Sequence, residues 1–252
     1  MEKEWIQAMI TYLDCHCEFF APMEDDTKIV ETYQNALEEG KTKGYVPLLI
    51  RVDDNLLDMV YINAGLEEWK QDNAVVAAYR KQMLTTKLPD AKAFFETKLA
   101  ERKELYEEEE WDFEEVMGEV ENGETLDRFI SYWNYEDQET YPLILAKIPV
   151  KNPWEVFAYV PFGNWNDCPN TETLMTVCKH WYETYGAVPA VITSDQLECY
   201  VKTTVDMEHA KELAMEQYLF CCDIVEQSGG DGTVGWLADC LATSTVWYFW
   251  WD

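Results

Sequence analysis

The sequence has 252 residues, of which 49 are acidic and 19 are basic, so its formal net charge is −30. A charge of that sign repels nucleic acid and anionic membranes and favours basic partners. Apolar residues make up 48% of the chain and aromatic residues 14%, which excludes an intrinsically disordered protein and is enough for a full core. We therefore expect a globular protein that binds neither nucleic acid nor membrane.

The first residues and the cysteines indicate the compartment. Residues 1–5 lack the basic start and apolar core of a signal peptide, and no run approaches the roughly 18 apolar residues of a membrane span. The eight cysteines include no Cys-x-x-Cys pair, and a chain of this length needs no disulfide framework. We expect a cytoplasmic protein with reduced thiols.

Helical and strand patterns alternate in the first 65 residues. Helix periodicity is present at 2–14 and 27–40, a continuous apolar run at 45–52 predicts a buried strand, and a short helix follows at 56–61. Gly40 or Gly44 ends the second helix, and Asp53 or Asp54 provides the N-cap of the third. This order indicates an α/β fold.

The middle of the chain is helical and then strongly acidic. Residues 66–106 have a helical pattern that breaks near Pro89, and eleven acids without a lysine or arginine lie between Glu104 and Glu124. Runs of acids are usually solvated faces or mobile loops. Aromatic residues interrupt this run, however, so docking of a partner is the alternative. The docking residues would be Glu107, Glu108, Glu109, Glu110 and Trp111.

From residue 141 the elements are short and closely spaced. Strands are expected at 142–149, 154–160, 188–193, 197–203 and 246–251, and helices at 171–185, 206–222 and 233–242. The last strand is rich in tryptophan and is expected in the interior. We predict an α/β fold, with α+β as the alternative. We expect a mixed central sheet with helices on both faces, plus a helical, acidic insertion. The chain is expected to divide into an N-terminal region at 1–65, the insertion at 66–140 and a core region at 141–252.

A polar turn at 162–169 follows the strand expected at 154–160. It places two amides, a carboxylate and a thiol beside bulky residues, on a loop of the kind that carries binding groups. Glu208, Glu212 and Glu216 form a row on one helix face, which is either solvated or suited to a cationic ligand. The candidate pocket is lined by Trp165, Asn166, Asp167, Cys168, Glu216 and Asp223.

Several residues occur together in a way that resembles the bacterial family named domain of unknown function 4253. They are Tyr45 to Pro47, Asp53, Pro161 to Pro169, Trp181, Tyr185 to Ala187, Asp195, Ala214, Glu216, Phe220 to Asp223, Gln227 and Trp247 to Asp252. Cys222 stands where the family pattern usually has proline. The resemblance implies a compact α/β domain and no established reaction.

No motif predicts a cofactor or a metal. The run Gly230 to Gly235 matches G-x-G-x-x-G, but it follows a helix, carries an aspartate and is better explained as a connection between helices. Cys15, His16 and Cys17 are adjacent, and adjacent residues rarely converge on one ion. His180 could meet Cys168 in a nucleophilic pair, or Cys168 and Cys221 in a zinc site, but neither spacing is typical of such sites.

Two functions from different classes remain. The charge favours a binding protein for a basic protein partner, such as an immunity protein that neutralises a toxin. The alternative is an enzyme with a carboxylate-lined pocket around the loop from Phe162 to Pro169. The sequence contains no complete catalytic constellation, so the first function is the expectation.

Overall fold

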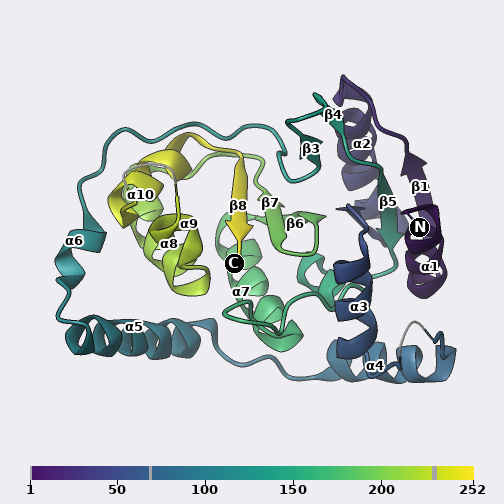
Figure 1. The fold of residues 1–252 in the computed structure, drawn as a ribbon, viewed down its shortest axis with the longest axis horizontal. Coiled ribbons are helices and arrows are strands. Elements are labelled where there is room, and N and C mark those ends of the chain that lie inside the picture. Colours follow the sequence, from purple (N-terminus) through teal and green to yellow (C-terminus); the bar gives the residue numbers. More distant parts are fainter. Residues whose placement is uncertain (1, 68–69, 229–231) are drawn as a thin grey trace.

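A computed structural model describes residues 2–67, 70–228 and 232–252, and a mixed six-stranded sheet is its centre (Figure 1). The strand order is β1-β5-β2-β6-β7-β8, in which β2 and β6 are parallel and the other neighbours are antiparallel. The strands are β1 (His16–Phe20), β2 (Val46–Ile50), β5 (Leu143–Ile148), β6 (Val188–Ile192), β7 (Gln196–Tyr200) and β8 (Val246–Trp250), and β3 (Trp133–Asn134) and β4 (Glu139–Thr140) form a separate ribbon.

Helices cover both faces of the sheet, as the alternation of elements predicted. They are α1 (Glu2–Leu13), α2 (Thr27–Lys43), α3 (Asp54–Asn63), α4 (Asn73–Thr85), α5 (Ala91–Glu108), α6 (Phe113–Met117), α7 (Thr171–Tyr185), α8 (Met207–Phe220), α9 (Asp223–Glu226) and α10 (Val234–Thr243), with a 3₁₀ helix η1 (Pro153–Ala158). One core lies between α2 and the sheet, and a larger core joins the other face to η1, α7 and α8. The prediction of an α/β fold is confirmed.

The helix ends follow the capping residues of the sequence. Gly44 ends α2 in the left-handed conformation and donates its N–H to the Gly40 carbonyl oxygen. Gly40 is itself required, because a Cβ there would lie 2.3 Å from the Tyr45 carbonyl oxygen. Asp53 caps α3 by accepting the Leu56 N–H at 2.8 Å. The expected connection from Gly230 to Gly235 includes residues 230 and 231, which lie outside the described residues. Thr233, within the same run, caps α10, so the connection ends at residue 233.

The prediction of a strand at 154–160 is wrong, because most of that segment forms the 3₁₀ helix η1. Asn152 and Glu155 form a capping box, in which Glu155 Oε2 accepts the Asn152 N–H at 3.0 Å, and Pro153 occupies the first turn. Proline is well suited to that position because it needs no hydrogen-bond partner there. The buried residues Val156 and Phe157 produced the strand-like pattern.

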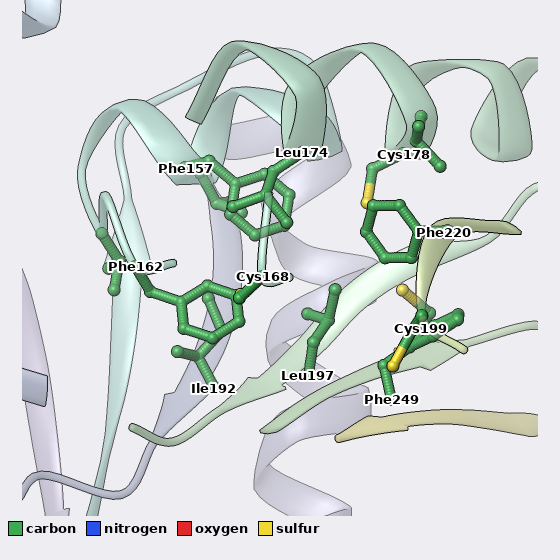
Figure 2. Packing of buried hydrophobic residues seen from close by; sticks show 14 of the residues in the cluster. Phe157, Phe162, Cys168, Leu174, Cys178, Ile192, Leu197, Cys199, Phe220 and Phe249 are labelled. Carbon is green, nitrogen blue, oxygen red and sulfur yellow. The ribbon is translucent and has the colours of Figure 1, made fainter. Parts of the chain in front are cut away.

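Two edge strands differ from expectation. The strand β1 was not predicted, because it is short and its burial pattern is irregular. The strand β8 was expected in the interior and is instead the last strand of the sheet, although Trp247 and Phe249 are fully buried. Figure 2 shows Phe249 beside Phe220 and Cys199 in the core beneath α7. Within the described residues, no helix is long and apolar enough to cross a membrane.

A buried carboxyl group joins β7 to the segment before β3. Glu198 in β7 has no exposed surface, and its two carboxyl oxygens accept the N–H groups of Ile130 at 2.9 Å and Ser131 at 3.4 Å. Burial raises the pKa of Glu198 from its ordinary value of 4.5 to about 7, against the opposing effect of these hydrogen bonds. The native state therefore holds the Glu198 proton more tightly than the unfolded chain does.

We predict that Glu198 makes the free energy of unfolding decrease between pH 5 and pH 8. Because the native state binds more protons in this range, stability falls as the pH rises, by about 2 to 3 kcal/mol for this group. Glu198→Gln does not titrate, so its decrease should be smaller than that of the wild type by that amount, as measured by urea unfolding at both pH values. Glu31→Gln, at an exposed position on α2, is the control and should behave like the wild type.

Candidate functional site

The polar turn from Phe162 to Pro169 is a tightly closed loop. Gly163, Asn164 and Asn166 all have positive φ angles, and a Cβ on Gly163 would lie 2.3 Å from the Pro169 carbonyl oxygen. The Asn164 N–H donates to the carbonyl oxygens of Cys168 and Pro169, both at 3.1 Å. The loop is therefore preorganised by its own backbone.

The end of α3 holds the same loop from the outside. Asn63 Nδ2 donates to the carbonyl oxygens of Pro161 at 2.8 Å and Gly163 at 3.0 Å. Cys168 is buried, and burial raises the pKa of its thiol well above the ordinary range. A thiol in that state is a poor nucleophile, so Cys168 serves as an apolar anchor of the loop.

Two of the predicted site residues meet at the backbone of Asp252. Asn166 Nδ2 donates to the Asp252 carbonyl oxygen at 2.8 Å, and Asp223 Oδ2 accepts the Asp252 N–H at 3.0 Å. The sequence could not show this contact, because the two residues are far apart in the chain. Both polar groups are occupied in tying residue 252 to the loop and to α9.

Glu216 points to α7 and away from the polar turn. Its two carboxylate oxygens contact His180 Nε2 and Trp181 Nε1, both at 2.9 Å. Trp181 is fully buried, so Glu216 satisfies a donor that would otherwise be lost in the core. The hydrogen bond that His180 donates to the Glu216 carboxylate raises the pKa of His180. Glu216 is thus an internal hydrogen-bond acceptor.

The six predicted pocket residues consequently do not line one cavity. Asp167 borders a hollow of about 210 Å³ between α5 and α8, together with Lys98 and Arg102. Trp165 borders a different cavity of about 380 Å³ beside α3. The expectation that Glu216 joins Asn166 and Asp167 in one pocket is wrong, because Glu216 is turned towards His180 and Trp181.

The cavity beside Trp165 lies at the carboxyl ends of the two parallel strands, β2 and β6. Asp53 follows β2 and Ser194 follows β6, and Ser194 Oγ donates to Asp53 Oδ2 at 3.0 Å. Asp195 lines the cavity and accepts the Trp250 indole N–H at 3.2 Å. Ligands of α/β sheets often bind at this place. Sequence analysis missed this convergence, although Asp53 and Asp195 both belong to the residues that carry the family resemblance.

The groups that this cavity offers to a ligand are two carboxylates and an indole ring. Asp58, Asp195 and Trp165 line it, which suits a cationic group. No histidine is among the residues that line this cavity, and His180 and His209 contact Glu216 and Asp206 elsewhere. Among the described residues, no group of three or more His, Cys, Asp or Glu side chains is arranged to hold a metal ion.

The acidic segment begins at the end of α5, at the periphery of the molecule (Figure 1). Glu107, Glu108, Glu109 and Glu110 are all exposed, and so is Trp111, at 59% of its surface. We call these five residues the acidic face. None of its carboxylates forms an ion pair with another described residue.

Trp111 is held in place although it is exposed. The backbone N–H of Trp111 donates to the Tyr106 carbonyl oxygen at 2.8 Å. The Trp111 ring packs edge to face against the buried Tyr106 ring, with the ring centroids 5.6 Å apart. Glu110 before it has a φ of 57°, in the left-handed region that a helix C-terminus usually fills with glycine. A glutamate in that conformation costs about 1 kcal/mol. The turn therefore keeps a charge where a glycine would be more stable.

Residues 144–252 match the family model described as a domain of unknown function, DUF4253, which confirms the resemblance for this part of the chain. No curated protein and no solved structure matches the chain. The matched segment contains the polar turn, Glu216 and Asp223. It does not contain the acidic face.

The contact between Glu216 and His180 can be tested through the titration of His180. Because Glu216 raises the His180 pKa, the ion pair stabilises the fold fully below the ordinary pKa of 6.5 and loses this effect as the pH rises through the raised value. We expect Glu216→Gln to lower the His180 pKa, as followed by NMR of the imidazole protons, while the Gln oxygen still accepts from Trp181. His209 pairs with Asp206 and is the internal control. A His180 pKa that does not change in the variant would contradict this contact.

Proposed function

We propose that the protein binds a basic protein partner through the acidic face. The observation that carries this proposal is the exposed Trp111 at the end of four carboxylates that have no ion pair within the described part of the chain. Tryptophan is enriched among the residues that dominate binding energy at protein interfaces. Carboxylates around it select cationic partners.

The geometry of Trp111 supports a docking role. Its backbone hydrogen bond and its contact with Tyr106 restrict the side chain before any partner arrives. Such preorganisation lowers the entropy cost of association. The strained left-handed Glu110 supports the same conclusion, since local strain is often retained where a functional group must be presented.

The charge of the whole chain adds long-range attraction to this local contact. With a net charge of −30, the protein attracts a basic partner from a distance and accelerates the encounter. A toxin with a basic surface is a partner of this kind, and an immunity-like protein would neutralise it by covering that surface. All eight cysteines are free thiols, which suits an encounter in the reducing cytoplasm.

A second candidate function rests on the cavity at the carboxyl ends of β2 and β6. Trp165 and Asp195 line it and provide an indole face and a carboxylate for a small cationic substrate. An enzyme acting there would need a base, and the lining carboxylates of Asp58 and Asp195 are groups of that type. The acidic face is the better supported site because its carboxylates are exposed and form no ion pair with any other residue that the structure describes.

We predict that exchanging Glu107, Glu108, Glu109 and Glu110 for Gln slows partner association several-fold at low salt. The screening length falls from roughly 10 Å at 0.1 M salt to 3 Å at 1 M, so the effect should be small at high salt. The partner is first isolated by affinity capture from the source cell, and association rates are then measured by stopped flow. The control exchanges four exposed glutamates on other elements, Glu24, Glu31, Glu136 and Glu172, for Gln and removes the same total charge.

Trp111→Ala separates docking from electrostatic steering. We expect it to raise the dissociation rate roughly tenfold at any salt concentration, because loss of a buried interface tryptophan typically costs more than about 1 kcal/mol. Equal association rates for the two quadruple variants, together with an unchanged dissociation rate for Trp111→Ala, would refute the acidic face as the docking site. Trp165→Ala then tests the second candidate.

A further inference from the structure

The hollow of about 210 Å³ that Asp167 borders lies at the surface, where the polar turn meets α5 and the end of α8. Its apolar wall includes three large side chains, Phe94, Leu219 and Phe220. Its charged groups come from α5 and from the polar turn, and they are Lys98, Glu101, Arg102 and Asp167. The two positive and two negative charges cancel, although the chain as a whole carries −30. The hollow therefore differs in charge from the rest of this acidic protein.

One pair of these charges is already compensated within α5. Lys98 Nζ donates to Glu101 Oε2 at 2.8 Å. Lys98 and Arg102 are four residues apart and therefore lie on the same face of the helix. The charges that remain for a ligand are those of Arg102 and Asp167.

Arg102 is fixed in position but keeps hydrogen-bond donors. Its side chain is only 18% exposed, and its guanidinium lies over the Tyr218 ring, 5.8 Å from the ring centroid. Its one ion pair within the described part of the chain is long, with Nη1 3.5 Å from Glu226 Oε1, and that oxygen also accepts the Tyr218 hydroxyl at 2.7 Å. A guanidinium has five N–H donors in a planar fork that matches a carboxylate. Arg102 can therefore bind a further carboxylate.

Asp167 provides the opposite charge. It is exposed, and its carboxylate forms no ion pair with any described residue, Arg102 included. Both charges act on the thiol of Cys222, which also lines the hollow. Burial raises the pKa of this thiol to about 12, while Arg102 lowers it and Asp167 raises it. The two charges thus face the same part of the hollow without pairing with each other.

We propose that this hollow binds a free α-amino acid with an apolar side chain. The ligand carboxylate meets Arg102, the ligand ammonium group meets Asp167, and the ligand side chain packs on Phe94 and Leu219. A ligand with both charges matches a hollow whose own charges cancel, whereas the charge of the chain repels a simple anion and Arg102 repels a simple cation. The volume is below the roughly 300 to 1,000 Å³ of sites for drug-sized ligands, which suits a small metabolite. The proposal does not rest on the acidic face.

The test compares L-leucine with two analogues that each lack one of its charges. 4-Methylpentanoate lacks the ammonium group, and 3-methylbutan-1-amine lacks the carboxylate. Affinities are measured by isothermal titration calorimetry on the full chain at low salt. We expect L-leucine to bind saturably and each analogue to bind roughly tenfold more weakly, because a hydrogen bond to a charged group is lost in each case. Glycine, which lacks the apolar side chain, should also bind more weakly than L-leucine.

Asp167→Asn removes the charge that meets the ammonium group and keeps the size of the side chain. We expect it to weaken L-leucine roughly tenfold and not to weaken 4-methylpentanoate, which has no ammonium group. Asp127→Asn, at an exposed position before β3, removes the same charge elsewhere and should change neither affinity.

Three results would overturn the proposal. The first is no saturable binding of L-leucine by the unaltered chain, a result that does not depend on whether a variant folds. The second is an analogue that binds as tightly as L-leucine, because the hollow would then be an anion site or a cation site only. The third is equal affinity of Asp167→Asn and the wild type for L-leucine, because the ligand would then occupy a different place.

Discussion

The contact on which the rest of the structure depends is the stacking of Trp181 on Phe249. The two rings are 5.2 Å apart and nearly parallel, at an angle of 10°, and Phe220 and Trp247 meet the Trp181 ring edge to face. This cluster joins α7, α8 and β8. Because β8 is an edge strand, it has a neighbouring strand on one side only, and the aromatic packing against the helices provides the rest of its stability.

The polar groups around this cluster follow from its burial. Trp181 needs an acceptor, and Glu216 provides it from α8. The Trp250 indole N–H donates to the Asp195 carboxylate. The Asp252 carbonyl oxygen accepts from Asn166, and the Asp252 N–H donates to Asp223. Asn166, Glu216 and Asp223, which the sequence predicted to line a pocket, instead form hydrogen bonds that anchor the last strand and its aromatic cluster. The indole N–H groups of Trp247 and Trp251 have no such acceptor among the described residues.

The sheet order shows how the family segment depends on the N-terminal part of the chain. The matched residues 144–252 contain β6, β7 and β8 and nearly all of β5, but β2 lies between β5 and β6 and comes from outside the segment. Without β2, the fully buried strand β6 would lose one of its two neighbours, and β5 would be separated from the sheet. The acidic face lies outside both this segment and the sheet, so its charge can vary with little cost to the fold.

Much of the fold was predictable because its signals are local. The apolar runs of β2 and β6, the caps of α3 and α8 and the glycine that ends α7 are each read within a few residues. The net charge and the exposed acids beside Trp111 are likewise properties of the sequence. The candidate docking face was therefore visible before the structure, although the left-handed turn that presents Trp111 was not.

Only the tertiary structure decided which distant residues meet. The sequence by itself determined the class of fold, most helices and strands, the charge and the family resemblance. It did not determine that 153–158 is a 3₁₀ helix, since a capping box and an alternating strand share one apolar pattern there. Nor did it show that Ser194 meets Asp53, that Glu216 turns to Trp181, or that Asp167 and Arg102 border one hollow. These contacts join residues up to 141 positions apart, and side-chain packing in three dimensions, rather than spacing along the chain, selects them.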